Sequence, residues 1–220
     1  MADADYFITI VTMVKKIGVL GSGTVGQTLA NGFTSLGFNV QIGSRDGKKV
    51  ENWKGSTGTF EEVAKDADLV VLAVKGLAAE GVVSSISQSL SKKIVIDTTN
   101  PISDIPPENG VLDYFTSLSD SLMERLQRVA SDAYFVKAFN SVGSAKMVNP
   151  VFKDGRPTMF ICGNSKSAKK EVISILDKLG WDSEDMGVAS SARAIEPLCM
   201  LWCIPGLTRN QWSHAFKLLK

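Results

Sequence analysis

The sequence predicts an α/β fold: a doubly wound parallel sheet in a single domain, with a short C-terminal helical appendage. Apolar runs alternate with helical patterns along the chain, without an internal repeat. Residues 69–74 are continuously apolar, as is typical of a parallel strand that is covered on both faces. With 220 residues, of which 44% are hydrophobic, the chain can bury one sizeable core.

A glycine motif follows the first predicted strand, residues 15–20. Gly21 permits a tight turn, Gly23 lets backbone approach a pyrophosphate because it has no Cβ, and Gly26 allows the next helix to pack closely. That helix, predicted from Thr24, points its amide groups at an anion above the glycines. The pattern indicates a Rossmann-type dinucleotide site, a plain turn being the alternative. Its predicted cofactor-binding residues are Gly21, Ser22, Gly23, Thr24, Val25 and Gly26.

The remaining elements are expected in alternating order. Further strands are predicted at 38–42, 57–60, 69–74, 93–97, 134–139, 158–162 and 182–186. Helices are predicted at 24–36, 61–67, 77–90, 119–129, 144–148 and 166–179, and from 190 to 220 with a break at Pro205-Gly206. Residues 102–116, with their prolines and an Asn-Gly pair, are expected to form a mobile loop at the carboxyl end of a strand.

Composition and charge exclude several classes of partner. Lys and Arg number 24 and Asp and Glu 23, so a net charge of +1 favours neither nucleic acid nor an anionic membrane. The apolar stretch at 6–14 is too short to span a bilayer and no cleavable signal pattern precedes it, so a cytoplasmic protein is expected. Residues 1–13 are expected to be a flexible extension. The three cysteines, Cys162, Cys199 and Cys203, lack disulfide-like spacing and are expected to be reduced thiols.

The end of the second strand indicates which dinucleotide binds. Sites for the non-phosphorylated cofactor carry an Asp or Glu here, whereas this chain has Ser44 and Arg45. A guanidinium can fork onto a 2′-phosphate and a serine hydroxyl can add one hydrogen bond, so NADP(H) is favoured. Lys48 and Lys49 are spaced to return to the same phosphate, a solvated basic turn being the alternative.

Residues after the later strands are candidates by position, because ligands of open α/β sheets bind outside the carboxyl ends of the strands. Val74 is expected near the adenosine or ribose, and Asn100, Pro101 and the segment around Ala138 near the nicotinamide. For Lys75, a phosphate contact, a solvated lysine and a catalytic acid all remain open. For Asn100, the alternative is a turn residue before proline. The full set is Ala73, Val74, Lys75, Asn100, Pro101, Ala138 and Asn140.

No catalytic residue and no metal site are assigned from the sequence. The single histidine, His214, lies in the last predicted helix and is expected to be a surface or packing residue. Paired carboxylates, zinc-ligand spacing and a nucleophile elbow are all missing from the sequence. Hydride transfer suits this composition, because the cofactor carries the reactive bond and the protein mainly positions it.

Four segments resemble a known family: 16–46 with its Gly-Ser-Arg ending, 97–102, 136–141 and 191–198. They are similar to the deazaflavin (coenzyme F420)-dependent NADP oxidoreductases, a family that includes the cytoplasmic NADPH-binding domain of the Steap metalloreductases. The similarity runs from about residue 14 to 220. It implies that Ser44, Arg45 and Lys49 clamp the 2′-phosphate and that Thr24 and Val25 lie at the pyrophosphate. It also implies hydride transfer between NADPH and a deazaflavin or flavin stacked on the nicotinamide.

One departure from the family leaves the second cofactor open: Phe139-Asn140 stands where the archaeal enzymes tend to have a histidine. The acceptor is expected to be enclosed by 98–101, 138–141, the loop 102–116 and the last helix, which bears Met200 and Trp202. We divide the chain into the extension 1–13, an NADP-binding domain at 14–189 and a helical segment at 190–220 that packs on the site or on a second subunit of a homodimer.

The sequence leaves two other functions open. One is a non-catalytic NADPH-binding sensor, which would bind cofactor without turnover. The other is an imine or carbonyl reductase like the pyrroline-5-carboxylate reductases, although that family adds a longer helical domain than the thirty or so residues here.

Overall fold

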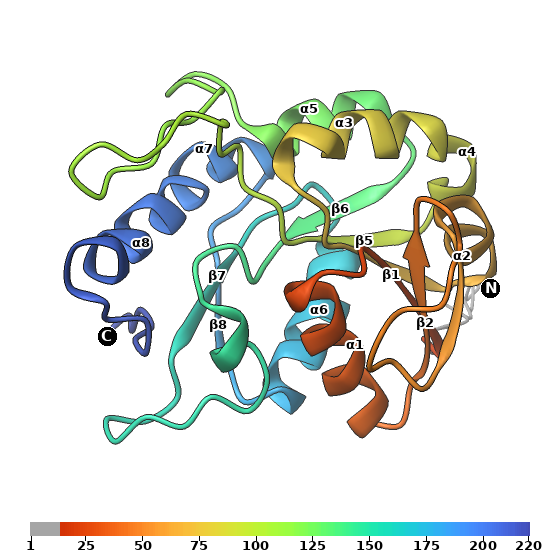
Figure 1. The fold of residues 1–220 in the computed structure, drawn as a ribbon, viewed down its shortest axis with the longest axis horizontal. Helices are drawn as coiled ribbons and strands as arrows, with labels where there is room; N and C mark the ends of the chain where they lie inside the picture. Colours follow the sequence, from red (N-terminus) through yellow and green to blue (C-terminus); the bar gives the residue numbers. More distant parts are fainter. Residues whose placement is uncertain (1–13) are drawn as a thin grey trace, which may run out of the picture.

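The computed structural model describes residues 14–220 (Figure 1). The predicted extension at 1–13 lies outside the described residues. The main sheet has six strands in the order β3-β2-β1-β4-β5-β6, and each neighbouring pair is parallel, which confirms the Rossmann-type α/β class. Its strands are β1 (Lys16–Leu20), β2 (Asn39–Ser44), β3 (Ser56–Thr59), β4 (Leu69–Leu72), β5 (Ile94–Asp97) and β6 (Tyr134–Lys137).

Helices cover both faces of this sheet, α3, α4 and α5 on one and α1 and α6 on the other (Figure 1). Leu29 and Phe33 of α1 pack with Val172 of α6 in one core cluster, and Val83 of α3 packs with Leu126 of α5 in a second. The helices are α1 (Thr24–Ser35), α2 (Phe60–Asp66), α3 (Gly76–Ser85), α4 (Ser87–Leu90), α5 (Leu122–Val129), α6 (Lys166–Lys178), α7 (Ala192–Ile195) and α8 (Pro197–Arg209).

The order of the strands fixes where a ligand can bind. β1 pairs with β2 on one side and with β4 on the other, so the chain crosses to the opposite half of the sheet between β3 and β4. At such a switch point the loops leave the carboxyl ends of β1 and β4 in opposite directions and a crevice opens between them.

A second, two-stranded parallel sheet adjoins β6. It consists of β7 (Thr158–Ile161) and β8 (Asp182–Asp185), and an antiparallel bridge between Lys137 and Cys162 joins it to the main sheet. The C-terminal tail, residues 210–220, runs beside β7, where the amide of Thr158 donates to the carbonyl of Phe216 at 2.8 Å.

The structure corrects three predicted boundaries. The strand predicted at 134–139 ends at Lys137, because Phe139 adopts a φ of 61° that turns the chain out of the sheet. The helix predicted at 77–90 is interrupted at Ile86, whose φ of −123° and ψ of 15° lie outside the helical range. The helix predicted at 119–129 begins at Leu122, because Ser121 caps it by accepting from the amide of Glu124.

The predicted helix break at Pro205-Gly206 is also wrong. Helix α8 continues through Pro205 to Arg209, and the chain then leaves the helix at Asn210 with a left-handed φ of 54°. Pro205 has no backbone N–H, so the carbonyl of Leu201, four residues earlier, lacks its helical hydrogen bond. Leu201 is exposed, so water can donate to this carbonyl instead. His214 therefore lies in the tail and not in a helix. None of the helices in residues 14–220 has the length and hydropathy needed to cross a bilayer.

Candidate functional site

A groove with two lobes follows the carboxyl ends of the strands. The β2 lobe, of about 820 Å³, lies beside the end of β2, and the β5 lobe, of about 470 Å³, lies beside the end of β5. Gly23, Ala73, Val74 and Lys75 line both lobes, so the two form one continuous groove. It occupies the switch point, where an elongated dinucleotide is expected.

The three glycines of the motif have three different environments. A Cβ on Gly21 would lie 2.2 Å from the carbonyl oxygen of Ala73, and Gly21 has a φ of +131°. A Cβ on Gly26 would lie 1.9 Å from the carbonyl oxygen of Gly21. Around Gly23, by contrast, no described atom lies within 4 Å of such a Cβ. Gly21 and Gly26 are thus required by the fold, whereas Gly23 leaves open space in the floor of the groove.

Two helices begin at this open space. Gly23 is the N-cap of α1 and Lys75 the N-cap of α3, and within the described chain neither helix has a side-chain cap or an acidic residue in its first turn. A Cβ on Gly76 would lie 1.9 Å from the carbonyl oxygen of Asn100, so α3 starts in close contact with the end of β5. Amide groups of both helix starts can therefore bind a phosphate anion between the lobes.

The turn after β2 supplies two charged side chains of the β2 lobe, in addition to that of Lys75. Ser44, Arg45 and Asp46 line it, and Arg45 and Asp46 are exposed. Phe60 and Val82 add apolar surface on which a purine ring can lie. Lys48 forms an ion pair with Asp46 at 3.0 Å, and Lys49 is exposed without lining the lobe.

The β5 lobe has a different lining. Val25, Leu77 and Ile102 give it apolar surface, and Leu77 is 49% exposed. Among the described residues that line this lobe, the titratable side chains are those of Lys75 and Asp104, and both are exposed. The lobe can therefore accept a flat apolar ring, with charge confined to its rim.

Beneath the end of the β5 lobe lies a buried ion cluster of Asp97, Lys137 and Glu196. The Nζ atom of Lys137 lies 2.6 Å from Asp97 Oδ2 and 2.9 Å from Glu196 Oε1, and the three side chains are at most 2% exposed. Lys137 also donates to the carbonyl oxygen of Thr99 at 2.8 Å. Three segments distant in the sequence thus meet at one ammonium group.

Each carboxylate of this cluster has further donors. Glu196 accepts from the amides of Leu122 and Met123 at 3.0 and 2.9 Å, so it caps the N-terminus of α5. Asp97 accepts from the amide and hydroxyl of Thr99 at 2.9 and 2.7 Å. Burial alone would lower the pKa of Lys137, but the two carboxylates outweigh that effect and raise it above the ordinary lysine value. The lysine is therefore charged at neutral pH.

The segments after β5 and β6 are also joined directly. Asn100 Nδ2 donates to the carbonyl of Asn140 at 2.8 Å, and Asn140 Nδ2 donates to Asn100 Oδ1 at 3.2 Å and to the carbonyl of Ile195 at 3.0 Å. Phe139, between β6 and Asn140, has a positive φ that is rare for a bulky side chain. This local strain directs Asn140 toward Asn100 and away from the sheet.

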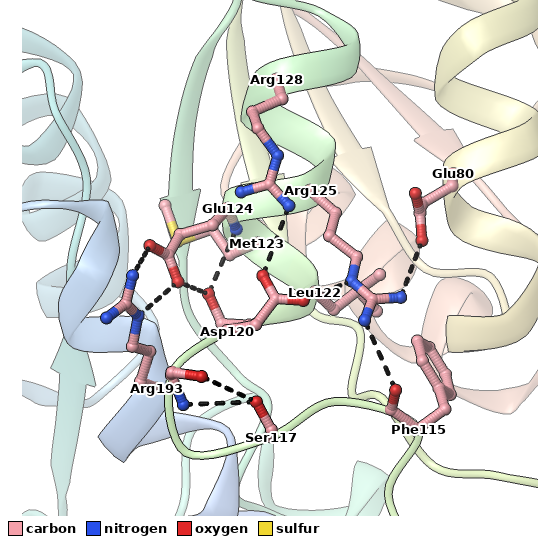
Figure 2. Close-up of polar contacts among 12 residues, drawn as sticks. Glu80, Phe115, Ser117, Asp120, Leu122, Met123, Glu124, Arg125, Arg128 and Arg193 are labelled. Carbon is pink, nitrogen blue, oxygen red and sulfur yellow. Dashed lines mark hydrogen bonds and ion pairs between the residues drawn. The ribbon is translucent and has the colours of Figure 1, made fainter.

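The loop over the β5 lobe is fixed at its C-terminal end (Figure 2). Arg125 of α5 donates to Asp120 at 2.7 Å, to Glu80 of α3 at 3.4 Å and to the carbonyl of Phe115 at 3.4 Å. Arg193 of α7 contacts both oxygens of Glu124 at 2.9 and 2.7 Å (Figure 2). The contacts of Arg125 join residues 115–120 to α5 and α3, and the Arg193–Glu124 pair joins α5 in turn to α7.

The predicted site residues divide into three groups. Those that line the groove are Gly21, Ser22, Gly23, Thr24, Val25, Ser44, Arg45, Ala73, Val74, Lys75 and Asn100. Pro101, Ala138 and Asn140 are buried behind the lining, and Gly26 is buried against Gly21. Lys49 is exposed at the rim of the turn.

Trp202, which was expected to help enclose the acceptor, lines neither lobe of the groove. Its indole is 7% exposed and stacks on His214 with 4.9 Å between ring centroids. It packs against Trp212 at 5.6 Å, and Gly143 contacts it as well. Trp202 therefore holds the C-terminal tail against the protein.

Several site residues were missed from the sequence. They are Asp46, Phe60, Leu77 and Val82, which line the groove, and the cluster of Asp97, Lys137 and Glu196 below it. A signal existed for two of them, since Asp97 ends and Lys137 lies within a strand that is predicted to be buried, where a charge requires a partner. The partner itself, Glu196, lies about 60 residues beyond Lys137 and carries no pattern that links them.

Comparison with known proteins identifies the family. Residues 16–101 match the family model described as NADP oxidoreductase, coenzyme F420-dependent. The chain is 31% identical to rat metalloreductase STEAP3 over 199 residues, but it spans only 38% of that protein's length. It is 27% identical to the F420-dependent NADP reductase of Methanothermobacter marburgensis, over 84% of this chain and 90% of that one.

A solved structure extends this similarity to the whole described fold. It comes from Arthrobacter sp. FB24 and is described as a candidate F420-dependent NADP reductase. It is 31% identical, covers 94% of this chain and 100% of its own, and superposes with a TM-score of 0.85. The segments that carry the buried cluster, residues 97–102, 136–141 and 191–198, are three of the four on which the sequence resemblance rests. The chain belongs to the family of coenzyme F420-dependent NADP oxidoreductases.

Proposed function

We propose that this protein transfers a hydride between NADP(H) and a planar flavin-type acceptor, with a deazaflavin as the preferred one. Family membership makes it an NADP-dependent oxidoreductase. The observation that carries the proposal is the open space at Gly23, between the starts of α1 and α3, in a groove with Ser44 and Arg45 at one end and apolar side chains at the other.

The two ends of the groove differ in charge, and this difference orients the bound cofactor. Arg45 and Ser44 in the β2 lobe suit the 2′-phosphate, and the amides at the two helix starts suit the pyrophosphate. The nicotinamide then extends into the β5 lobe, next to Asn100. Lys75, which lines both lobes, is positioned for a phosphate contact.

The chemistry of the β5 lobe favours a ring acceptor over a carbonyl. NADPH supplies the hydride, and a flavin-type ring receives it at a ring atom while its proton comes from water. Reduction of a ketone instead needs a proton donor beside the developing alkoxide. Of the described residues that line this lobe, Lys75 and Asp104 are the titratable ones, and both are in contact with solvent. Val25, Leu77 and Ile102 provide the apolar contact surface that a ring requires.

A screen of acceptors tests the reaction. NADPH oxidation is followed without oxygen against a deazaflavin, FMN, FAD, a ferric chelate and a cyclic imine. We expect the deazaflavin to be reduced fastest, and NADPH deuterated at C4 to transfer its label to the acceptor ring. Fastest turnover with the imine, or cofactor binding without turnover on any acceptor, would contradict the proposal and support the reductase or sensor alternative.

The variant Lys75→Met distinguishes a phosphate-binding role of this lysine from a role in proton transfer. We expect kcat for deazaflavin reduction to stay within about threefold of the parent, while KM for NADPH rises, because the lysine binds phosphate and moves no proton. Lys170→Met, which removes an exposed lysine from α6, is the matched control and should change neither value. A hundredfold loss of kcat in Lys75→Met would instead assign proton transfer to this lysine.

Arg45→Ala tests the cofactor assignment. The parent should bind NADPH at least about tenfold more tightly than NADH, a difference of about 1.4 kcal/mol that one charge-assisted contact can supply. The variant should lose most of this preference through weaker NADPH binding, and its affinity for NADH serves as the internal control. Equal affinities of the parent for both dinucleotides would contradict the assignment.

A further inference from the structure

The β2 lobe contains an acid among the groups that suit a phosphate. Asp46 lines the lobe next to Ser44 and Arg45. Its Oδ1 accepts from the Ser44 hydroxyl at 3.2 Å and from the Lys48 amide at 3.2 Å, and its Oδ2 lies 3.0 Å from Lys48 Nζ. The carboxylate thus engages the same hydroxyl that a 2′-phosphate would use, together with the nearest ammonium group.

This carboxylate is ionised and accessible to a ligand. Its side chain is 54% exposed, and that of Lys48 is 81% exposed. The hydrogen bonds from the Lys48 side chain and amide hold the pKa of Asp46 below the ordinary aspartate value. A carboxylate has about four lone-pair positions, so it can accept another hydrogen bond in addition to those from Ser44 and Lys48.

The two dinucleotides would meet this group differently. A 2′-phosphate brings negative charge toward a negative carboxylate and must take Ser44 and Lys48 away from it. A ribose with a 2′-hydroxyl brings a donor, and an acidic side chain at this point of the fold is the usual acceptor for it. Asp46 lies 20 residues beyond Gly26 and two residues past the end of β2, close to the position of such an acid, although Arg45 next to it favours the phosphate.

We propose that Asp46 is a specificity-determining residue that weakens NADP(H) binding, accepts the 2′-hydroxyl of NAD(H), and so makes NAD(H) a second, weaker cofactor. The inference rests on the cofactor site of the proposed function. It assigns to the turn after β2 opposing contributions from two adjacent side chains, Arg45 for the phosphate and Asp46 for the hydroxyl.

Asp46→Asn removes the charge while keeping an oxygen that can accept from the Lys48 amide, so the turn is preserved. Equilibrium titrations with NADPH and NADH compare it with the parent and with Glu51→Gln, a control that removes an exposed acid of the same loop outside the groove. We expect NADPH to bind about fivefold more tightly and NADH about threefold more weakly at low salt. The gain for NADPH should shrink at about 1 M salt, where exposed charges are screened. The control should shift neither affinity by more than about twofold.

The opposite directions of the two shifts decide the outcome. If NADPH binds no more tightly to Asp46→Asn, or if both dinucleotides shift in the same direction, the carboxylate acts through the shape of the turn and the inference is overturned. The binding titrations need no hydride acceptor. If the protein binds NADPH but reduces no acceptor, the proposed reaction is contradicted and the inference about Asp46 still stands. If the parent protein binds neither NADPH nor NADH, both the proposed function and the inference about Asp46 are overturned.

Discussion

The β2 lobe and the floor below the β5 lobe both depend on charged side chains, but they hold them in opposite ways. Arg45, Asp46 and Lys48 come from one turn and are exposed to solvent. Asp97, Lys137 and Glu196 come from β5, β6 and the junction of α7 and α8, and they are at most 2% exposed. Charges in a single exposed turn can exchange partners with a ligand, whereas buried charges from separate elements already have partners inside the protein and are closed to a ligand.

This difference assigns distinct roles to the two regions. An exposed ion pair contributes about 0–1 kcal/mol to stability, so side chains of the β2 lobe can change with little cost to the fold. Removal of one member of a buried cluster leaves an uncompensated charge in a nonpolar interior. We therefore expect the β2 lobe to be tunable for cofactor choice, while the cluster fixes the segments that border the β5 lobe, where we propose that the nicotinamide lies.

Lys137→Met should produce the largest effect. It removes the ammonium between two buried carboxylates, so we expect a loss of about 3–5 kcal/mol in the free energy of unfolding, measured by urea denaturation. Lys169→Met is the matched control: this lysine is also buried, but its partner Asp185 is 41% exposed and can be solvated. If Lys137→Met loses no more unfolding free energy than the control, the buried cluster is not more sensitive to charge removal than an ion pair with one exposed partner, and the contrast between the two regions is contradicted.

Gly23→Val should abolish binding and preserve the fold. The open space at this position accepts a side chain, but that side chain then fills the place of the pyrophosphate, so NADPH affinity should fall at least about a hundredfold, or about 2.7 kcal/mol. Thermal unfolding should change little. Gly81→Val, at another glycine with open space but on α3 outside the groove, should leave binding intact.

Gly26→Val completes this comparison within the motif. A side chain here would collide with the carbonyl oxygen of Gly21, so the variant should lose folded structure as well as binding. Circular dichroism distinguishes the two variants. If Gly23→Val unfolds like Gly26→Val, the space at Gly23 serves the turn and not a ligand.

The smallest effect is expected at the ion pair between Glu124 and Arg193. The hydrogen bonds from Arg193 hold the pKa of Glu124 below its ordinary value, so the ionised form stabilises the folded state. This stabilisation is full above the unfolded pKa of about 4.3 and is lost as the pH falls through the lower folded value. Glu124→Gln should therefore unfold at a lower temperature than the parent at pH 7, with the difference closing toward about pH 3. A difference that stays constant down to about pH 3 would contradict this assignment.

The sequence was sufficient to predict the half of the site built from local patterns. The glycine motif, Ser44 and Arg45 lie within one βαβ unit, and their positions follow from the spacing along the chain. The strands and their parallel arrangement were predictable for the same reason. Asn100 and Lys75 followed from the rule that ligands bind at strand ends, without any knowledge of their contacts.

The other half depends on packing that no local pattern describes. Glu196 reaches Lys137 only because the junction of α7 and α8 lies over the start of α5. The continuation of α8 through Pro205 and the burial of Trp202 under the tail depend equally on tertiary contacts. Ala138, predicted to border the nicotinamide, lies fully buried in the core. A larger side chain there would disturb core packing, so its effect on activity would not report on contact with the acceptor.

We infer that one groove holds NADP(H) with its phosphate end at the exposed turn and its nicotinamide above the buried cluster. A crystal structure with NADP⁺ bound tests this most directly. We expect the 2′-phosphate to contact Ser44 and Arg45, the pyrophosphate to lie on Gly23, and the nicotinamide to lie beside Asn100 in the β5 lobe. A nucleotide bound in the reverse direction, or outside the two lobes, would contradict the account.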